Sequence, residues 1–206
     1  MIRFIYADSL DTYPHLRDTM FRDRARQFKD RLNWEVSVDA NGFERDAYDA
    51  INPLYIIAEN TRGGHAGSMR VLPTTGPTMV NDHFLHLTDG VAIQSPFIWE
   101  CTRFCLSPRA DSKVAGALML AGAEFGCASG LSHSVGVFDA RMILVYRRLG
   151  WVPELMGSQG QGRSAISVGL WSMDSDLRER LSARTGISRQ ISTHWYARAF
   201  GPSLAA

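Results

Sequence analysis

The stretch FIWECTRFCL at residues 97–106 decides the fold, because it reads as an apolar strand that closes at Ser107-Pro108 and leads into a helical pattern. Over residues 112–129 the apolar side chains fall at helical spacing and are surrounded by alanine and glycine. So many small residues predict that this helix packs closely on a sheet. The run LSHSVGVF at 131–138 then predicts a second strand.

The N-terminal part of the chain predicts further strands and one long helix. Ser9 can cap that helix, and Arg62-Gly63-Gly64 separates two apolar runs as the turn of a hairpin does. The expected elements are a strand at 2–8, a helix from about Leu10 to Leu32, an irregular acidic crossing segment at 34–52, and a hairpin of 54–60 with 66–73.

The C-terminal part continues the alternation of helices and strands. The expected elements are a short helix at 139–149 ending at Gly150, strands at 151–157 and 165–173, a helix near 174–184, and a poorly patterned, peripheral tail from about 185. The whole order predicts an α/β (α+β) fold: one domain over 1–206, with a mixed, mostly antiparallel sheet flanked by helices.

Composition sets broad limits on function. The chain has 206 residues, 45% hydrophobic and 21% charged, and its net charge of +1 gives no reason to expect nucleic acid as a partner. No secretory signal and no membrane-spanning run is visible, and three cysteines suit a reducing cytoplasm. Cys101 and Cys105 lack the spacing of a zinc site, so we expect no metal. Of the 22 basic residues only Lys29 and Lys113 are lysines, a bias that base composition of the genome can also produce.

The first group of candidate site residues lies on the predicted N-terminal helix. Arg24, Phe28 and Arg31 are four and three residues apart and therefore share a helical face, and Trp34 lies just beyond the helix end. Such a cation–aromatic group suits an adenine ring and a sulfonium, since both favour π faces. The alternative is that the aromatic residues belong to the core and the arginines are solvated.

Two further groups carry charge into unusual places. Glu44, Asp46 and Asp49 lie within six residues, and suit either a cationic substrate, paired arginines or a solvated loop. Glu100 and Arg103 lie inside an apolar strand, where charge is costly unless it is paired or used. Strict alternation places them on opposite faces, so a shared site requires a bulge between them. A structural ion pair with Arg70 is the alternative to a general base at Glu100.

Phosphate cradles are not apparent. The glycine-rich run at 157–163 does not stand between a strand and a helix start, and the strand–helix junction at 107–113 contains no glycine. No dinucleotide-binding fingerprint is present either. The lack of this fingerprint argues against an ordinary methyltransferase.

Four pieces of sequence resemble the autoinducer synthase family of the LuxI type, in order and with ordinary gaps. They are R-x-x-x-F-x-x-R-L-x-W at 24–34, E-R-D-x-Y-D at 44–49, M-R-V-L-P-T-T-G-P at 69–77 and W-E-C-T-R-F at 99–104. The resemblance implies an acyl-homoserine-lactone synthase with a GCN5-related N-acetyltransferase-like fold, which carries a bulge in the strand at 97–106. It favours a functional reading of all three charged groups.

The resemblance also implies roles for single residues. Glu100 is the expected general base, supported by Asp49, Arg70 and Arg103. S-adenosylmethionine is expected among Arg24, Phe28, Trp34, Asp46, Thr102 and Arg103. In the family reaction the methionyl amine attacks a fatty-acyl thioester, and the methionyl carboxylate then closes the lactone and releases methylthioadenosine. S-adenosylmethionine is thus a substrate and not a cofactor.

The acyl donor needs an apolar pocket and, if it is an acyl carrier protein, a basic surface. The expected pocket residues are Phe84, Met119, Val135, Gly136, Val137, Met142, Tyr146 and Leu170. The expected carrier-protein patch is Arg109, Lys113, Arg141, Arg147 and Arg148. Gly136 stands where family members that make 3-oxo products carry threonine, which favours another acyl chain. Acyl carrier protein is the preferred donor over acyl-coenzyme A.

Two rival functions remain open at this level. One is a GCN5-related N-acyltransferase acting on another amine, which predicts the glycine loop that 107–113 lacks. The other is a non-catalytic small-ligand-binding module, which has no need of a general base at Glu100.

Overall fold

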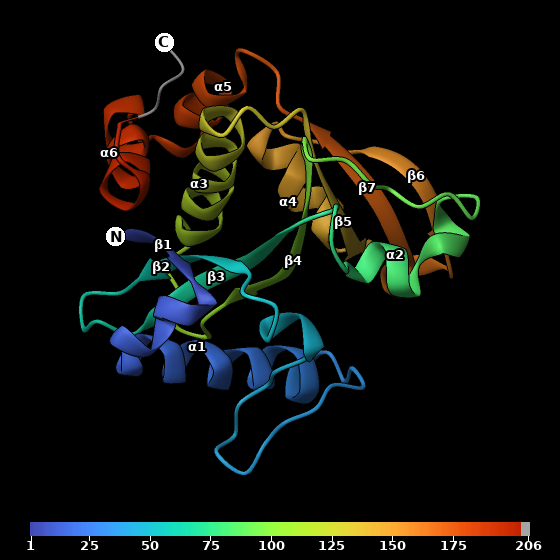
Figure 1. The fold of residues 1–206 in the computed structure, drawn as a ribbon, viewed down its shortest axis with the longest axis horizontal. Coiled ribbons are helices and arrows are strands. Elements are labelled where there is room, and N and C mark those ends of the chain that lie inside the picture. The colour runs from blue at the N-terminus through green and yellow to red at the C-terminus, as the bar shows by residue number, and fades with distance from the viewer. Residues whose placement is uncertain (203–206) are drawn as a thin grey trace. The chain divides into compact units, whose positions relative to one another are not determined.

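The computed structural model describes residues 1–202 and contains a seven-stranded sheet with the strand order β1-β2-β3-β4-β5-β7-β6 (Figure 1). The strands are β1 (Ile2–Tyr6), β2 (Leu54–Glu59), β3 (His65–Pro73), β4 (Ile98–Leu106), β5 (His133–Asp139), β6 (Glu154–Gln159) and β7 (Ile166–Ser172). β4 and β5 run parallel, whereas β1–β2, β5–β7 and β6–β7 are antiparallel pairs. The predicted mixed, mostly antiparallel sheet is confirmed.

Helices lie before, between and after these strands. The α-helices are α1 (Pro14–Ala25), α2 (Met79–His83), α3 (Val114–Ala128), α4 (Met142–Leu149), α5 (Leu177–Thr185) and α6 (Arg189–Phe200). The shorter segments are the 3-10 turns η1 (Ala7–Thr12), η3 (Ala47–Asp49), η4 (Leu85–Leu87) and η5 (Gly162–Ser164), and the π-helical η2 (Arg26–Arg31). No helix among residues 1–202 is long and apolar enough to cross a membrane.

The chain divides into two compact units. Unit 1 consists of Met1–Arg70 and Arg103–Leu118, and unit 2 of Val71–Thr102 and the chain from Met119 onward. β3 and β4 each contribute residues to both units. That the whole chain acts as one domain stays a prediction.

In unit 1, α1 lies along the strands β1, β2 and β3 (Figure 1). Their shared core includes Leu16, Met20 and Phe21 from α1 and Tyr55 and Ile57 from β2. These side chains are all less than 5% exposed, so their burial contributes much of the stability of this unit.

The predicted start of the first helix was wrong. Residues 7–12 form a 3-10 turn, and the α-helix begins at Pro14, whose fixed φ suits a first helical position. Ser9 therefore caps nothing; its hydroxyl donates to Asp8. The predicted C-terminal end near Leu32 agrees with the structure, although the last six residues are π-helical. A π-helical turn leaves no mark in apolar spacing, so sequence reasoning did not find it.

The hairpin between β2 and β3 formed as predicted. The backbone N–H of Asn60 donates to Gly64 O (2.8 Å). Gly63 takes a φ of +77°, which a glycine adopts without strain. The stretch from Trp34 to Asn52 is irregular, as expected, apart from η3 and one isolated bridge between Val38 and Glu44.

In unit 2, β5, β7 and β6 form an antiparallel ladder beside which α2 lies (Figure 1). α4 is followed by Gly150 with a φ of +76°, as predicted, and the glycine-rich run joins β6 to β7. In the tail, residues 189–200 form α6, capped by the Ser188 hydroxyl, which accepts a hydrogen bond from Ile191 N–H. Ser192 of α6 is fully buried.

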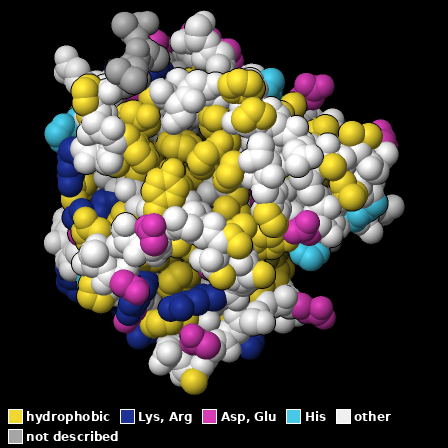
Figure 2. All heavy atoms as spheres, viewed as in Figure 1, with side chains coloured by type: hydrophobic (Ala, Val, Ile, Leu, Met, Phe, Trp, Pro, Cys, Tyr) yellow, Lys and Arg dark blue, Asp and Glu magenta, His cyan; other side chains and the backbone are white. Residues whose placement is uncertain are grey.

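The surface carries charges of both signs. On the face drawn in Figure 2, acidic and basic side chains are interspersed with hydrophobic ones. This distribution agrees with the net charge of +1. Among residues 1–202, no three histidines, cysteines or carboxylates are grouped as metal ligands are.

Candidate active site

Arg24 is the centre of a buried group of charges in unit 1. It stands in the last turn of α1 and is 1% exposed. Its Nε donates to Glu44 Oε2 (2.6 Å), and its two terminal nitrogens donate to the two carboxylate oxygens of Asp49 (both 2.9 Å). The paired contact with Asp49 uses the planar geometry that distinguishes arginine from lysine.

Two more arginines complete this group. Arg70 of β3 donates to Asp49 Oδ1 (2.8 Å) and Asp46 Oδ2 (3.0 Å). Arg103 of β4 contacts Glu44 Oε1 (3.0 Å) and Asp46 Oδ2 (2.7 Å). We call these six residues the charged cluster: Arg24, Glu44, Asp46, Asp49, Arg70 and Arg103. Three arginines balance three carboxylates, so the acidic group pairs with arginines, one of the alternatives that its sequence left open.

Burial and pairing act in opposite directions on these groups. Burial alone raises the pKa of Asp49, but the adjacent guanidinium groups of Arg24 and Arg70 hold the pKa well below its usual range. Burial alone lowers the pKa of Arg24, but Asp49 and Glu44 raise it further above its already high value. Both groups are therefore charged at neutral pH, and their pairing offsets the cost of removing them from water.

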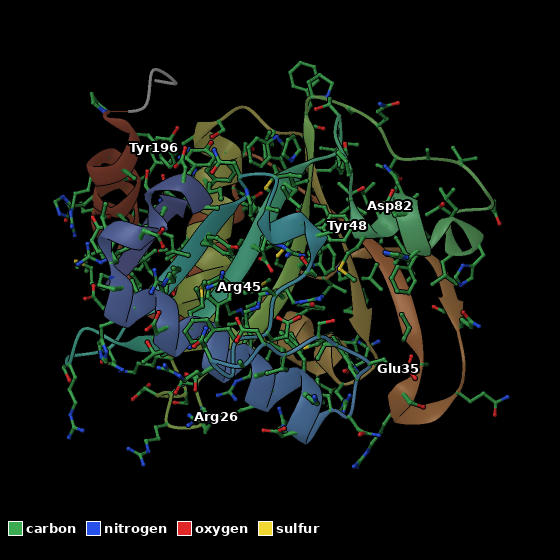
Figure 3. All side chains as sticks on the ribbon, turned by 60° about the horizontal axis from the view of Figure 1, so that its bottom comes forward. Arg26, Glu35, Arg45, Tyr48, Asp82 and Tyr196 are labelled. Carbon is green, nitrogen blue, oxygen red and sulfur yellow. The ribbon has the colours of Figure 1, made fainter. Side chains whose placement is uncertain are left out.

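The acidic crossing segment is held in place by its own backbone. Asp46 caps η3: its carboxylate accepts Tyr48 N–H and Asp49 N–H, and Asp49 Oδ2 accepts Asp46 N–H (2.9 Å). This reciprocal capping helps to orient both carboxylates that the arginines bind. Figure 3 labels Arg45 and Tyr48, which flank Asp46 on the segment that passes beside the N-terminal helix.

Trp34 folds back on the helix end, as its position predicted. Its ring stacks on Phe28 with a centroid distance of 5.2 Å and an interplanar angle of 11°. The backbone N–H of Trp34 donates to Phe28 O (2.8 Å). The Arg103 guanidinium lies over the Phe28 ring, 5.4 Å from its centroid. Arg31 does not belong here: it is exposed and donates to Gln27 Oε1. The predicted helical face therefore contributes Arg24 and Phe28 but not Arg31.

β4 has one residue with unusual backbone geometry. Arg103 has a φ of +53°, which is rare for a residue other than glycine and occurs at the first residue of one type of β-bulge. Its side chain meets Glu44 and Asp46. That Glu100 and Arg103 serve one site stays a prediction.

Glu100, three residues earlier on β4, is fully buried in unit 2. Its carboxylate accepts Met79 N–H (3.0 Å) and Val80 N–H (2.6 Å), the first two amides of α2. Sequence reasoning did not anticipate this contact with the turn that follows the P-T-T-G-P motif. Thr102 is also buried, at 7% exposure.

The expected acyl-pocket residues divide between two faces of the sheet. Val135 pairs with Leu170, and both belong to an apolar group with Phe84 and Val137. Gly136 points to the opposite face, where Tyr146 packs edge-on against Trp171 (5.0 Å) and a Cβ on Gly136 would meet Trp171 at 3.4 Å. Because side chains alternate along a strand, these residues do not all face the same side of the sheet. That they line the acyl pocket stays a prediction. Met119 is buried on α3 and Met142 half-buried on α4.

The expected carrier-protein patch consists of exposed side chains in both units. Arg109 and Lys113 belong to unit 1, and Arg147 and Arg148 to unit 2. Arg141 pairs with Asp139 at 2.6 Å. That these five form one surface stays a prediction.

Glu44, which the sequence marked within the acidic group, joins Arg24 to Arg103. One member of the site was not singled out from sequence: Tyr55, which donates its hydroxyl to Asp49 Oδ1 (2.6 Å). Tyr55 looks like any core residue of an apolar strand, so no signal marked it.

This fold is that of the N-acetyltransferase-like acyltransferases: an N-acetyltransferase from Lactobacillus plantarum matches with a TM-score of 0.56 at 13% identity, covering 84% of this chain and 99% of that one. The autoinducer synthase family model matches residues 9–181, so the chain belongs to that family. It is an acyltransferase, an acyl-homoserine-lactone synthase that makes a quorum-sensing signal.

Individual relatives agree with this assignment. An acyl-homoserine-lactone synthase of Rhizobium etli is 40% identical over 193 residues, covering 88% of this chain and 91% of that protein. One of Agrobacterium fabrum is 36% identical over 171 residues, covering 78% and 80%. The synthase LasI has a TM-score of 0.77 at 26% identity, covering 89% of this chain and 94% of that one. The coenzyme A-dependent synthase BjaI, solved with S-adenosylmethionine and isopentyl-coenzyme A, has a TM-score of 0.80 at 25% identity, covering 90% and 89%.

Proposed function

We propose that this chain joins S-adenosylmethionine to a fatty-acyl thioester, closes the lactone and releases methylthioadenosine. The observation that carries the proposal is on β4, where Glu100 and Arg103 are three residues apart and Arg103 takes a positive φ that leaves regular strand geometry. One strand thereby presents a buried carboxylate and an arginine of the charged cluster. The relative BjaI supports the choice of substrates, because its structure contains S-adenosylmethionine and an acyl-coenzyme A.

S-adenosylmethionine binds, in this proposal, against Phe28 and Trp34, with Arg24, Asp46, Thr102 and Arg103 around it. The charged cluster has equal numbers of positive and negative groups, so its net charge does not attract a sulfonium. The stacked rings of Phe28 and Trp34 offer π faces, which attract both a cation and an adenine ring. Asp46, the most exposed carboxylate of the cluster at 20% of its side chain, is placed to meet the substrate's ammonium group.

Glu100 is the proposed general base for the first step. The ammonium group gives a proton to the Glu100 carboxylate, and the free amine attacks the thioester carbon. The carbon–sulfur bond breaks, the carrier leaves as a thiolate, and the nitrogen's second proton neutralises that thiolate. Asp49 and Arg70 support the reaction, in this proposal, by holding the charged cluster in a fixed arrangement.

Lactone closure follows within the acylated molecule. The methionyl carboxylate attacks the carbon beside the sulfonium, and the bond from that carbon to sulfur breaks. The electron pair of this bond stays on sulfur, so methylthioadenosine is released as a neutral thioether. The sulfonium is a good leaving group, so this step needs mainly positioning. No bound cofactor takes part in either step as proposed.

The acyl donor is, in our proposal, an acyl carrier protein. The exposed Arg147 and Arg148 on α4 support this choice, because carrier proteins are acidic and oppositely charged surfaces speed association. Some relatives use coenzyme A instead, as BjaI does. Glycine at 136 favours an acyl chain without a 3-oxo group, because no hydroxyl is available at that position to bind one. We place the reaction in the cytoplasm, where both substrates are made.

Mass spectrometry of the medium of cells that express the chain tests the proposed product. A lactone with a single dominant acyl chain supports the proposal, and none in excess of vector-only cells contradicts it. A purified assay for methylthioadenosine, with acyl-carrier protein and acyl-coenzyme A side by side, tests the donor. Equal kcat/KM values would refute the preference for the carrier protein while leaving the reaction intact.

A further inference from the structure

Thr78 has a buried hydroxyl that contacts no hydrogen-bond partner among residues 1–202. The residue is 0% exposed, and its Oγ1 is without a donor or acceptor. Such groups are uncommon in folded proteins, because a buried polar atom without a partner loses its bonds to water and gains nothing in return. The position of this hydroxyl therefore needs an explanation.

The backbone of Thr78 has the geometry of a helix cap. Its φ of −141° and ψ of 150° are extended, and its carbonyl accepts the N–H of Asp82 (2.9 Å), which begins α2. A threonine in this position ordinarily accepts an N–H of the second or third helical residue with its hydroxyl. Here it accepts none.

Glu100 occupies the place that the threonine hydroxyl would take. Its two carboxylate oxygens accept the amides of Met79 and Val80, the first and second residues of α2. The helix is thus capped by a side chain from β4, and the Thr78 hydroxyl makes no hydrogen bond within the described part of the chain.

The proposed reaction disturbs this arrangement. When Glu100 accepts a proton from the substrate's ammonium group, one oxygen becomes a hydroxyl, and the carboxyl group binds backbone N–H groups less strongly. A buried amide at the start of α2 would then lose its partner. A threonine in the cap position can reach the amide of the second helical residue, here Val80, by rotation about its Cα–Cβ bond.

We propose that Thr78 is a positioning residue for Glu100: its hydroxyl takes over the amide of Val80, the second residue of α2, when the Glu100 carboxylate turns to the substrate. The inference rests on the proposed role of Glu100 as the base. It assigns a purpose to the unused hydroxyl, which keeps α2 in place during proton transfer.

A thermal-denaturation cycle of T78V, E100Q and the double variant tests the handover. Valine has nearly the shape of threonine but no hydroxyl, and glutamine offers the two amides only one oxygen. We expect T78V alone to leave Tm unchanged or slightly raised, because the resting hydroxyl makes no bond. In the E100Q background it should lower Tm by about 2–6 °C, as loss of a cap does.

Thr74 provides the matched control, since it is a buried threonine of the same motif with its hydroxyl fully used. Its Oγ1 donates to Ser95 O and Ile98 O and accepts Ser95 N–H (3.0 Å). T74V should lower Tm by the same amount with glutamate or glutamine at 100. Equal Tm changes from T78V in the two backgrounds, or a marked loss from T78V alone, would overturn the handover.

A kinetic comparison uses no Glu100 variant and therefore decides the question even if E100Q does not fold. We expect T78V to lower kcat about tenfold, the effect of one lost hydrogen bond, with KM for both substrates within about twofold. T78S should restore kcat to within about twofold of the unaltered protein. Unchanged kcat in T78V overturns the proposal; no methylthioadenosine release by the unaltered protein overturns the proposed function instead.

Discussion

Glu44 illustrates how one residue can hold the charged cluster together. It is 0% exposed and gives one oxygen to Arg24 and the other to Arg103. E44Q removes one negative charge and leaves two buried arginines with too few carboxylates. We expect the free energy of unfolding to fall by about 3–5 kcal/mol. Urea denaturation measures this change, with E35Q at an exposed glutamate as the control; a loss below about 1 kcal/mol would show that the cluster rearranges freely.

Trp34 is the residue whose removal should separate ligand binding from stability. Its ring is 39% exposed although it stacks on Phe28. W34A should therefore weaken S-adenosylmethionine binding about tenfold, the loss of one aromatic contact of roughly 1.4 kcal/mol, and change Tm little. Titration calorimetry measures the Kd, and W34F should retain most of the affinity. Equal affinities of W34A and the unaltered protein would place the adenine elsewhere.

At the scale of elements, His65 joins α1 to β3 through a buried network. Its Nδ1 lies 2.9 Å from Asp23 Oδ2 and its Nε2 lies 3.0 Å from Ser68 Oγ. Burial lowers the pKa of His65, although Asp23 opposes this, so the folded chain holds the ring neutral. Asp23 stands next to Arg24 in sequence, and the network therefore fixes the helix turn from which Arg24 reaches the charged cluster.

The network predicts a loss of stability in mild acid. Below about pH 6.5 the unfolded chain protonates this histidine, whereas the folded chain does so only at a lower pH, because burial lowers the pKa of His65. Unfolding therefore becomes more favourable as the pH falls. The pKa of Asp23 is lowered by His65 despite the opposing effect of burial, so its own contribution is lost only at lower pH. We compare how far Tm falls per pH unit between pH 6.5 and 5 in the unaltered protein and in H65Q. The decrease should be larger in the unaltered protein by about 2–4 °C per pH unit. Parallel Tm curves for the two would contradict this prediction.

At the scale of the tertiary structure, Glu124 of α3 binds both C-terminal helices. It is 1% exposed and contacts Arg178 of α5 (3.2 Å) and Ser192 of α6 (2.8 Å). Because Arg178 and Arg189 are partly solvated, we expect E124Q to cost about 1–3 kcal/mol, less than a fully buried pair. E179Q, which removes the exposed partner of Arg189, should cost under about 0.5 kcal/mol. Equal costs in urea denaturation would show that α6 is held by other contacts.

Local spacing predicted those parts of the site that depend on neighbours in the chain. Trp34 lies near Phe28 because the helix ends between them, and Arg103 takes a positive φ where a bulge was expected. Spacing failed for contacts between distant segments. The amides of α2 bind Glu100 over some twenty residues of sequence, and Arg103 binds Glu44 over 59.

By itself, the sequence determined the order of the elements, the mixed sheet and the family, because apolar periodicity, turn residues and four spaced motifs are local properties that a chain carries before it folds. Only the tertiary structure decided that three carboxylates pair with three arginines, that Glu100 caps α2, and that Thr78 keeps an unused hydroxyl. The physical reason is that a buried charge or polar group takes whatever partner folding brings within reach, and sequence spacing does not contain that distance.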